Sequence, residues 1–297
     1  ILGRKEVLTG KAKFGIFGGG KELAQIAMSK VFQNGDFRAG YYRDQTFALA
    51  SGIVTVKQIF AQLYANPSLA ADPHSGGRQM NNHFATRNIH PDGSWKNLLQ
   101  QKNSAADNSP TANQMLRALG LALASKKYRE LKDILKDERF SENGNEVCFV
   151  TIGDASTSEG FFWEVLNAAC VQQVPLIINV WDDGYGISVP KELQTTKGSI
   201  SDVLKGFEST PEISSLKIIK VNAWDYPALI KTYKESIQEV REKHVPLLIH
   251  IEGMTQVQGH STSGSHERYK SQERLDWELE YDCNSQMRTW MLDKDLA

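Results

Sequence analysis

The amino-acid sequence predicts an α/β protein with a mostly parallel sheet and helices on both faces of that sheet. Two observations support this fold class. Apolar, β-rich runs alternate with helical segments through the second half of the chain. The 297 residues, 40% hydrophobic and 23% charged, have the composition of a globular protein and not of a disordered one. No repeat or clear linker divides the chain, so we expect a single domain over residues 1–297.

Helices and a long irregular segment are predicted for the first part of the chain. Apolar residues recur three and four positions apart within 21–33 and 56–66, as they do in amphipathic helices. Residues 67–109 show no periodicity, and an irregular stretch of about forty residues is typical of functional or mobile loops. A further helix is expected over about 110–136.

Strands and helices are predicted to alternate from residue 146 onward. Strands are expected over 146–152, 175–181, 216–221 and 246–253, with helices over 160–173 and 225–243. This alternation favours a parallel sheet that is covered on both faces. Because ligands bind outside the carboxyl ends of the strands in such sheets, we expect the site among the polar segments 153–160, 182–190 and 254–270.

Charge, hydropathy and cysteine content argue against several classes of partner. With 34 Lys and Arg against 35 Asp and Glu, the chain has no field of one sign to attract nucleic acid or an anionic membrane. The longest apolar run, residues 174–181, is far shorter than the roughly 20 residues of a membrane span. Cys148, Cys170 and Cys283 are odd in number and lie far apart, which predicts reduced core thiols in a cytoplasm-like compartment.

Two aspartates follow consecutive predicted strands. Asp154 lies in the segment Gly153–Gly160, which leads into a helix whose first N–H groups favour phosphate. Asp183 follows the next predicted strand. Each aspartate alone is more typical of a turn or a helix cap. Together, with a backbone carbonyl and phosphate oxygens, they supply the oxygen ligands that Mg²⁺ prefers.

Five polar segments form a pattern along the chain. They are YYRDQTFALASG (41–52), SGGRQMNNHF (75–84), NSPTANQM (108–115), GDASTSEG continuing to ISVP (153–190) and GHSTSGSHERY (259–269). The fourth segment resembles the thiamine-diphosphate motif, in which Gly-Asp-Gly is followed later by Asn. In this order the five segments resemble the alpha subunit of the decarboxylating component of 2-oxo acid dehydrogenase complexes, over residues 21 to 290. The resemblance implies a thiamine-diphosphate-binding fold, with thiamine diphosphate and Mg²⁺ as cofactors.

The resemblance also implies roles for individual residues. The implied Mg²⁺ ligands are Asp154, Asp183 and the carbonyl of Tyr185. The implied diphosphate contacts are the side chains of Tyr42 and Arg43 and the backbone N–H groups of Ala155 and Ser156, with Gly153 opening the motif. Backbone positions at Ser109 and Thr111 match those that hold the aminopyrimidine ring. His260 matches the active-site histidine of the family, which implies a hydrogen bond or proton donated to the substrate or lipoyl group.

The sequence departs from the family pattern at two motif positions. Ala155 replaces the third residue of Gly-Asp-Gly, a small change that a turn tolerates. Asp183 stands where the family has Asn, and its charge is expected to hold Mg²⁺ more firmly while repelling the diphosphate. The net effect on cofactor affinity stays open. Asn179 is a rival for that Asn, but its place inside an apolar strand favours Asp183.

Four further features carry alternatives. His83 is a second active-site histidine or a plain surface residue, and Lys197 is a candidate to replace an arginine that the family has beyond the second strand. Ser261 matches a serine phosphorylated in mitochondrial relatives, and it is equally typical of an unmodified hydrogen-bonding group. The triplet Gly18–Gly20 precedes a helix, but no convincing strand precedes the triplet, which argues against a dinucleotide site.

The activity implied by the resemblance is the oxidative decarboxylation of a 2-oxo acid, with transfer of the acyl group to a lipoyl group on a partner acyltransferase. In this family the glutamate that activates the aminopyrimidine ring belongs to the beta subunit, typically within a heterotetramer. We therefore expect little activity without a beta subunit or beta portion. The implied location is the cytoplasm of a bacterium or the mitochondrial matrix.

The substrate is predicted from short segments. Ser-Thr-Ser-Glu-Gly at 156–160 and GHSTSGS at 259–265 resemble the branched-chain members of the family. The alternatives are the alpha subunit of pyruvate or acetoin dehydrogenase, a transketolase-like enzyme and a non-catalytic scaffold subunit.

Overall fold

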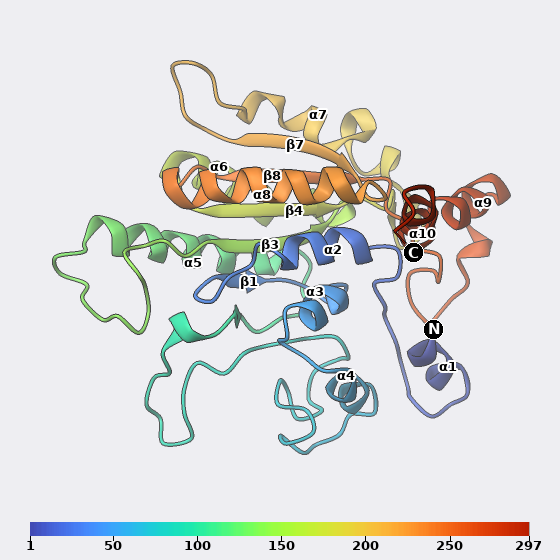
Figure 1. The fold of residues 1–297 in the computed structure, drawn as a ribbon. Helices are drawn as coiled ribbons and strands as arrows, with labels where there is room; N and C mark the ends of the chain where they lie inside the picture. Colours follow the sequence, from blue (N-terminus) through green and yellow to red (C-terminus); the bar gives the residue numbers. More distant parts are fainter. Residues whose placement is uncertain (297) are drawn as a thin grey trace.

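Six parallel strands form the central sheet within residues 1–296, which the computed structural model describes (Figure 1). In spatial order they are β2 (Asn103–Ser104), β1 (Phe37–Ala39), β3 (Cys148–Gly153), β4 (Leu176–Trp181), β8 (Leu247–Glu252) and β7 (Lys217–Asn222). Every neighbouring pair in this sheet is parallel. The predicted fold class is therefore confirmed.

Helices cover both faces of the sheet, and adjacent side chains of the central strands point to opposite faces. Ile177 and Leu247 belong to one buried cluster, whereas Ile178 and Leu248 belong to the other. The first cluster includes side chains of α2 (Glu22–Ser29), α3 (Gln45–Ala50) and α8 (Tyr226–Lys243). The second includes side chains of α5 (Asn113–Glu130), α6 (Gly160–Gln172) and α7 (Ile200–Val203). Burial on both faces explains why β3, β4 and β8 are continuous apolar runs in the sequence.

The principal predicted elements are present, with shifted ends. The helix expected over 21–33 ends earlier, at Ser29. The helices expected over 56–66 and 110–136 are α4 (Val56–Leu63) and α5. The four predicted strands are β3, β4, β7 and β8, and the two helices predicted between them are α6 and α8.

Several short elements lie where the sequence predicts none. They are α1 (Leu2–Leu8), β1, α3, α7 and a hairpin of β5 (Tyr185–Gly186) with β6 (Val189–Pro190). The segment 67–109 is mostly irregular, as predicted, but it contains β2, which joins the sheet beside β1. After β8 the chain forms α9 (Gln272–Glu280) and α10 (Cys283–Asp293).

The structure bears on two expectations drawn from composition, one about the cysteines and one about membrane-spanning helices. All three cysteines are buried and unpaired, which confirms that they are core thiols. Burial raises the pKa of Cys283 to about 12. No helix within the described residues combines the length and the apolar character that crossing a membrane requires.

Candidate cofactor and metal site

A polar cavity of about 280 Å³ lies at the carboxyl ends of β3 and β4. These strands are hydrogen-bonded neighbours, with Gly153 opposite Trp181, so the residues that follow them meet at one edge of the sheet. All of the predicted cofactor-binding residues except Ser109 line the cavity: Tyr42, Arg43, Thr111, Gly153, Asp154, Ala155, Ser156, Asp183, Tyr185 and His260. The lining residues that the sequence did not predict are Tyr41, Trp181, Gly186 and Ile187.

Asp154 has a carboxylate oxygen without a partner. Its side chain is buried, and its Oδ2 makes no hydrogen bond within the described residues. Burial, reinforced by the charges of Asp183 and Asp182, raises the pKa of Asp154 well above its usual value. A buried carboxylate oxygen that lacks a donor is stabilised by a cation. The donor chemistry at Asp154 therefore fits a hard divalent ion such as Mg²⁺.

Asp183, in contrast, is already held by cationic side chains. Lys21 Nζ donates to Asp183 Oδ2 at 2.9 Å, and Arg274 Nη2 donates to the Asp183 carbonyl oxygen at 2.7 Å. Burial alone would raise the pKa of Asp183, but the charges of Lys21 and Arg43 outweigh burial and lower that pKa. The guanidinium of Arg274 also lies 5.3 Å from the centre of the Tyr185 ring. The turn from Asp183 to Tyr185 is thus fixed at its side chains and its backbone.

Lys21 is a residue of this site that the sequence analysis missed. It follows a glycine triplet that packs closely against two other segments. A Cβ on Gly20, whose φ is +88°, would lie 2.3 Å from the carbonyl oxygen of Thr255, and one on Gly18 would lie 2.3 Å from that of Arg43. The triplet precedes α2 but follows no strand, so close packing explains it and a dinucleotide site does not. A lysine directly after three glycines was the available signal.

Arg43 and His260 contact each other at the cavity. Arg43 Nη2 lies 2.9 Å from His260 Nδ1, and Arg43 Nη1 donates to the carbonyl oxygen of Phe17 at 2.8 Å. Because a guanidinium only donates, Nδ1 accepts, and the neutral ring carries its proton on Nε2. Burial, with the charge of Arg43 adding to it, lowers the pKa of His260 to about 4. His260 is therefore neutral at pH 7 and offers Nε2–H as a donor.

Of the two residues predicted at the aminopyrimidine ring, the structure places only Thr111 on the cavity wall. The Oγ of Ser109 lies 3.2 Å from Nε2 of His83. His83 is buried, with its Nδ1 3.0 Å from the carbonyl oxygen of Met80 and its ring 6.4 Å from that of Tyr42. The alternative that made His83 a surface residue is wrong.

Two other candidates do not reach the cavity. Lys197 is exposed, and its Nζ lies 3.4 Å from the carbonyl oxygen of Asp202, so it does not take an arginine's place at this site. Asn179 is buried inside β4, where it donates to the Val150 carbonyl and accepts from the Tyr233 hydroxyl. The rival Asn179 is thereby excluded, because both ends of its amide are engaged in the core.

The backbone N–H groups predicted to bind phosphate lie in a turn that precedes the predicted helix. Ala155 and Ser156 lie in a short 3₁₀ turn, Ala155–Ser158, and α6 begins only at Gly160. The backbone N–H groups at the cavity therefore belong to this turn and not to the first turn of α6. The helix predicted over 160–173 is α6 and begins at the predicted residue.

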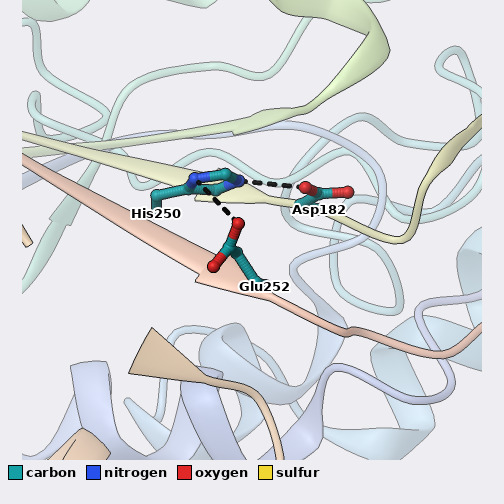
Figure 2. A group of neighbouring side chains, drawn as sticks. All are labelled: Asp182, His250 and Glu252. Carbon is teal, nitrogen blue, oxygen red and sulfur yellow. Dashed lines mark hydrogen bonds and ion pairs between the residues drawn. The ribbon is translucent and has the colours of Figure 1, made fainter. Parts of the chain in front are cut away.

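A second polar group lies at the ends of β4 and β8 (Figure 2). His250 Nε2 lies 3.0 Å from Asp182 Oδ2, and the Glu252 carboxylate lies 3.7 Å from His250 Nδ1. The spacing of these three side chains is compatible with a metal ion. However, Lys191 Nζ already pairs with Asp182 Oδ2 at 3.0 Å, and the Ser201 hydroxyl lies 2.9 Å from His250 Nδ1. The group is therefore a satisfied network that fixes Asp182, next to Asp183.

A parallel sheet with a polar cavity at its strand ends is the arrangement of ligand-binding α/β proteins. Residues 7–297 match the model of the family described as dehydrogenase E1 component. The chain belongs to this family, which confirms the resemblance found in the sequence. Membership of the family implies thiamine diphosphate as the cofactor.

The relatives bear names of the same kind. The chain is 31% identical over 269 residues to the alpha subunit of 2-oxoisovalerate dehydrogenase of Bacillus subtilis, covering 90% of this chain and 70% of the relative. It is 30% identical over 207 residues to subunit alpha of 3-methyl-2-oxobutanoate dehydrogenase of Mycobacterium tuberculosis, covering 69% and 50%. It is 24% identical over 287 residues to the human mitochondrial 2-oxoisovalerate dehydrogenase subunit alpha, covering 96% and 55%. The chain thus spans about half the length of the last two.

Proposed function

We propose that this chain is the alpha-type part of an enzyme that decarboxylates a branched-chain 2-oxo acid with thiamine diphosphate and Mg²⁺. The acyl group passes to a lipoyl group on a partner acyltransferase. The observation that carries the proposal is the cavity at the ends of β3 and β4. It gathers residues from five separate segments around Asp154, whose buried Oδ2 has no partner within the described chain.

Different residues of this cavity wall are assigned to the cation and to the diphosphate. Asp154, Asp183 and the carbonyl of Tyr185 hold Mg²⁺, since carboxylate and carbonyl oxygens suit this ion. Tyr42 and Arg43 hold the diphosphate, together with backbone N–H groups of the turn Ala155–Ser158. Thiamine diphosphate, when bound, supplies the carbanion chemistry at the 2-oxo carbon. These residues fix where that chemistry occurs.

His260 orients the substrate. Its Nδ1 faces Arg43, and its Nε2–H is the donor that remains for a carbonyl or carboxylate oxygen in the cavity. Because burial and Arg43 keep the ring neutral, the contact to an anionic 2-oxo acid is a hydrogen bond to a neutral donor. The proposed role is the same for a lipoyl thiol or carbonyl.

A partner completes the site. Among the described residues that line the cavity there is no glutamate. The resemblance of the chain to this family implies that the activating glutamate belongs to a beta subunit. The relatives are named as alpha subunits, which supports a beta-type partner or portion for this chain. The relatives' names also favour branched-chain 2-oxo acids over pyruvate.

Dye reduction by the full-length assembled protein tests the proposal. The protein is supplied with Mg²⁺ and thiamine diphosphate, and branched-chain 2-oxo acids, pyruvate and 2-oxoglutarate are compared. We expect fastest turnover with a branched-chain acid, and its loss in both Asp154→Ala and His260→Ala. Asp154→Ala also loses Mg²⁺-dependent cofactor binding, followed through fluorescence of Trp181 at the cavity wall, whereas His260→Ala retains it.

Other outcomes select the alternatives. Turnover with pyruvate alone would replace the substrate class and leave the site intact. Cofactor binding without turnover of any 2-oxo acid would favour a transketolase-like enzyme. No cofactor binding in the assembled protein would favour a scaffold subunit.

A further inference from the structure

Lys21 is a buried ammonium group with all of its donors engaged. Its side chain is 1% exposed. Nζ donates to Asp183 Oδ2 at 2.9 Å, to Gln256 Oε1 at 2.8 Å and to the carbonyl oxygen of Thr255 at 3.1 Å. An ammonium has three N–H donors, so none remains for a phosphate or a substrate. Lys21 therefore acts on the cavity through Asp183.

Apart from the contact with Asp183, the position of Lys21 is unfavourable for a cation. It is the N-cap residue of α2, where the helix dipole disfavours a cation. Burying an ammonium is costly unless it is paired and hydrogen-bonded. Its position is set by the close packing of Gly20 on Thr255, which is also one of its acceptors. Placing this cation beside Asp183 therefore costs stability in two ways, through the helix dipole and through burial of the ammonium.

The charges around the strand ends indicate what the Lys21–Asp183 pair does. Three aspartates lie together at the strand ends. Lys191 pairs with Asp182 at 3.0 Å, and Lys21 pairs with Asp183 at 2.9 Å, which leaves Asp154 without a cationic partner among residues 1–296. The family motif has a neutral Asn where this chain has Asp183. An Asp–Lys pair has the same net charge as that Asn.

We propose that Lys21 is the counter-charge of Asp183, a positioning residue that lets this carboxylate act in the cation site with the net charge of a neutral ligand. The inference rests on the proposed function, because it concerns the same cation site. It answers the question left open by the sequence: the charge added by Asp183 does not repel the diphosphate, since Lys21 cancels it.

A double-mutant cycle in the full-length assembled protein tests the pair. The variants are Lys21→Gln, Asp183→Asn and the double variant. In metal-free buffer we expect each single variant to lower Tm by about 5–15 °C, because each leaves one buried charge unpaired. The double variant is expected to lose less than either single variant, because both charges are gone.

Binding of Mn²⁺ alone, followed by electron paramagnetic resonance without cofactor, separates a counter-charge from a purely structural lysine. Lys21→Gln should bind Mn²⁺ more tightly, on the order of tenfold, because a positive charge beside the site has been removed. The double variant should return to within a few-fold of the unmodified protein. A lysine that only stabilised the fold would leave Mn²⁺ affinity unchanged or weaken it.

Lys191→Gln is the matched control. Lys191 is also bonded to an aspartate of this turn, but its partner is Asp182. Combined with Asp183→Asn, its loss of Tm should simply add. Additive losses for Lys21→Gln with Asp183→Asn, or unchanged or weaker Mn²⁺ binding by Lys21→Gln, would overturn the inference while leaving the proposed function standing. Failure of the unmodified protein to bind Mn²⁺ at all would overturn the cation site, and the inference with it.

Discussion

The carboxylates at the neighbouring ends of β3 and β4 differ in whether a cationic side chain pairs with them. At the end of β3, Asp154 has a buried oxygen to which no described residue donates. At the end of β4, Asp182 and Asp183 are each paired with a lysine, Lys191 and Lys21. The carboxylates at the β4 end are therefore paired within the described chain, whereas the β3 end keeps the carboxylate oxygen to which we propose that a cation binds. We therefore expect substitutions at the end of β4 to act mainly on stability, and substitutions at the end of β3 to act mainly on ligand binding.

Asp154→Asn should have the largest effect and should act in opposite directions on binding and stability. Removing the carboxylate should weaken Mg²⁺-dependent binding of thiamine diphosphate by about 100-fold or more, since the ion loses a charged ligand. The metal-free protein should gain stability, on the order of 1 kcal/mol or more, because an unpaired buried charge is gone. Calorimetric titration and thermal unfolding of the assembled protein measure the two effects. A loss of stability together with retained binding would reverse the comparison between the strand ends.

His250→Ala probes the β4 end and should act mainly on stability. It removes one of the two side-chain partners of Asp182 Oδ2, a ring that is itself fully buried, at an expected cost of about 2–4 kcal/mol. Mg²⁺ affinity should change only a few-fold, because Asp154 and Asp183 are untouched. Urea unfolding measures the cost. Glu252→Gln serves as the control, since its carboxylate is partly exposed and 3.7 Å from the ring, and should cost less than about 1 kcal/mol.

The strands, and the positions of Asp154 and Asp183 at neighbouring strand ends, were predictable because their signals are local. β3, β4 and β8 are buried on both faces and so read as continuous apolar runs. Asp154 and Asp183 follow two of these strands directly, and the rule that ligands bind at carboxyl ends of parallel strands brings them together.

Other parts of the fold and site depend on contacts that no local pattern encodes. β1 has three residues, and its central Arg38 is fully buried between Asp44 and Asp107, at 2.7 and 3.0 Å. A charged residue in so short a run hides the strand. Lys21 escaped detection because its partner Asp183 is remote in sequence and meets it only after α2 packs against α3 and α8 on one face of the sheet.

Arg274→Met should sharpen the comparison by loosening the β4 end without removing a carboxylate. Arg274 donates to the Asp183 carbonyl and stacks near Tyr185 and Trp277. We expect a loss of about 1–2 kcal/mol in stability and a three- to tenfold weaker Mg²⁺ affinity, because the carbonyl of Tyr185 is no longer held in place. Lys197→Met, at an exposed lysine away from the cavity, is the control and should change neither quantity. Equal effects of the two variants would contradict a role for Arg274 at this turn.

Replacing His244 separates the acid sensitivity of the fold from the acid sensitivity of the cofactor site. It ends α8 with φ +55°, and its Nε2 lies 2.8 Å from the carbonyl oxygen of Gly144. Burial, reinforced by the charge of Arg129, lowers the pKa of His244 to about 4. The unfolded chain has a histidine pKa of about 6.5 and binds a proton first. The contribution of His244 is therefore complete above about pH 6.5 and is lost as the pH falls toward 4.

His244→Asn should flatten this pH dependence, because asparagine tolerates the left-handed backbone and does not titrate. Between pH 7 and pH 5 the fall in Tm should be smaller by about 2–4 °C than in the unmodified protein. Cofactor affinity at pH 7 should not change, since His244 lies at the end of α8 remote from the cavity. An unchanged slope of Tm with pH would place the acid sensitivity elsewhere. His260, also neutral because its pKa is about 4, would then be the next histidine to replace, and the effect would belong to the site.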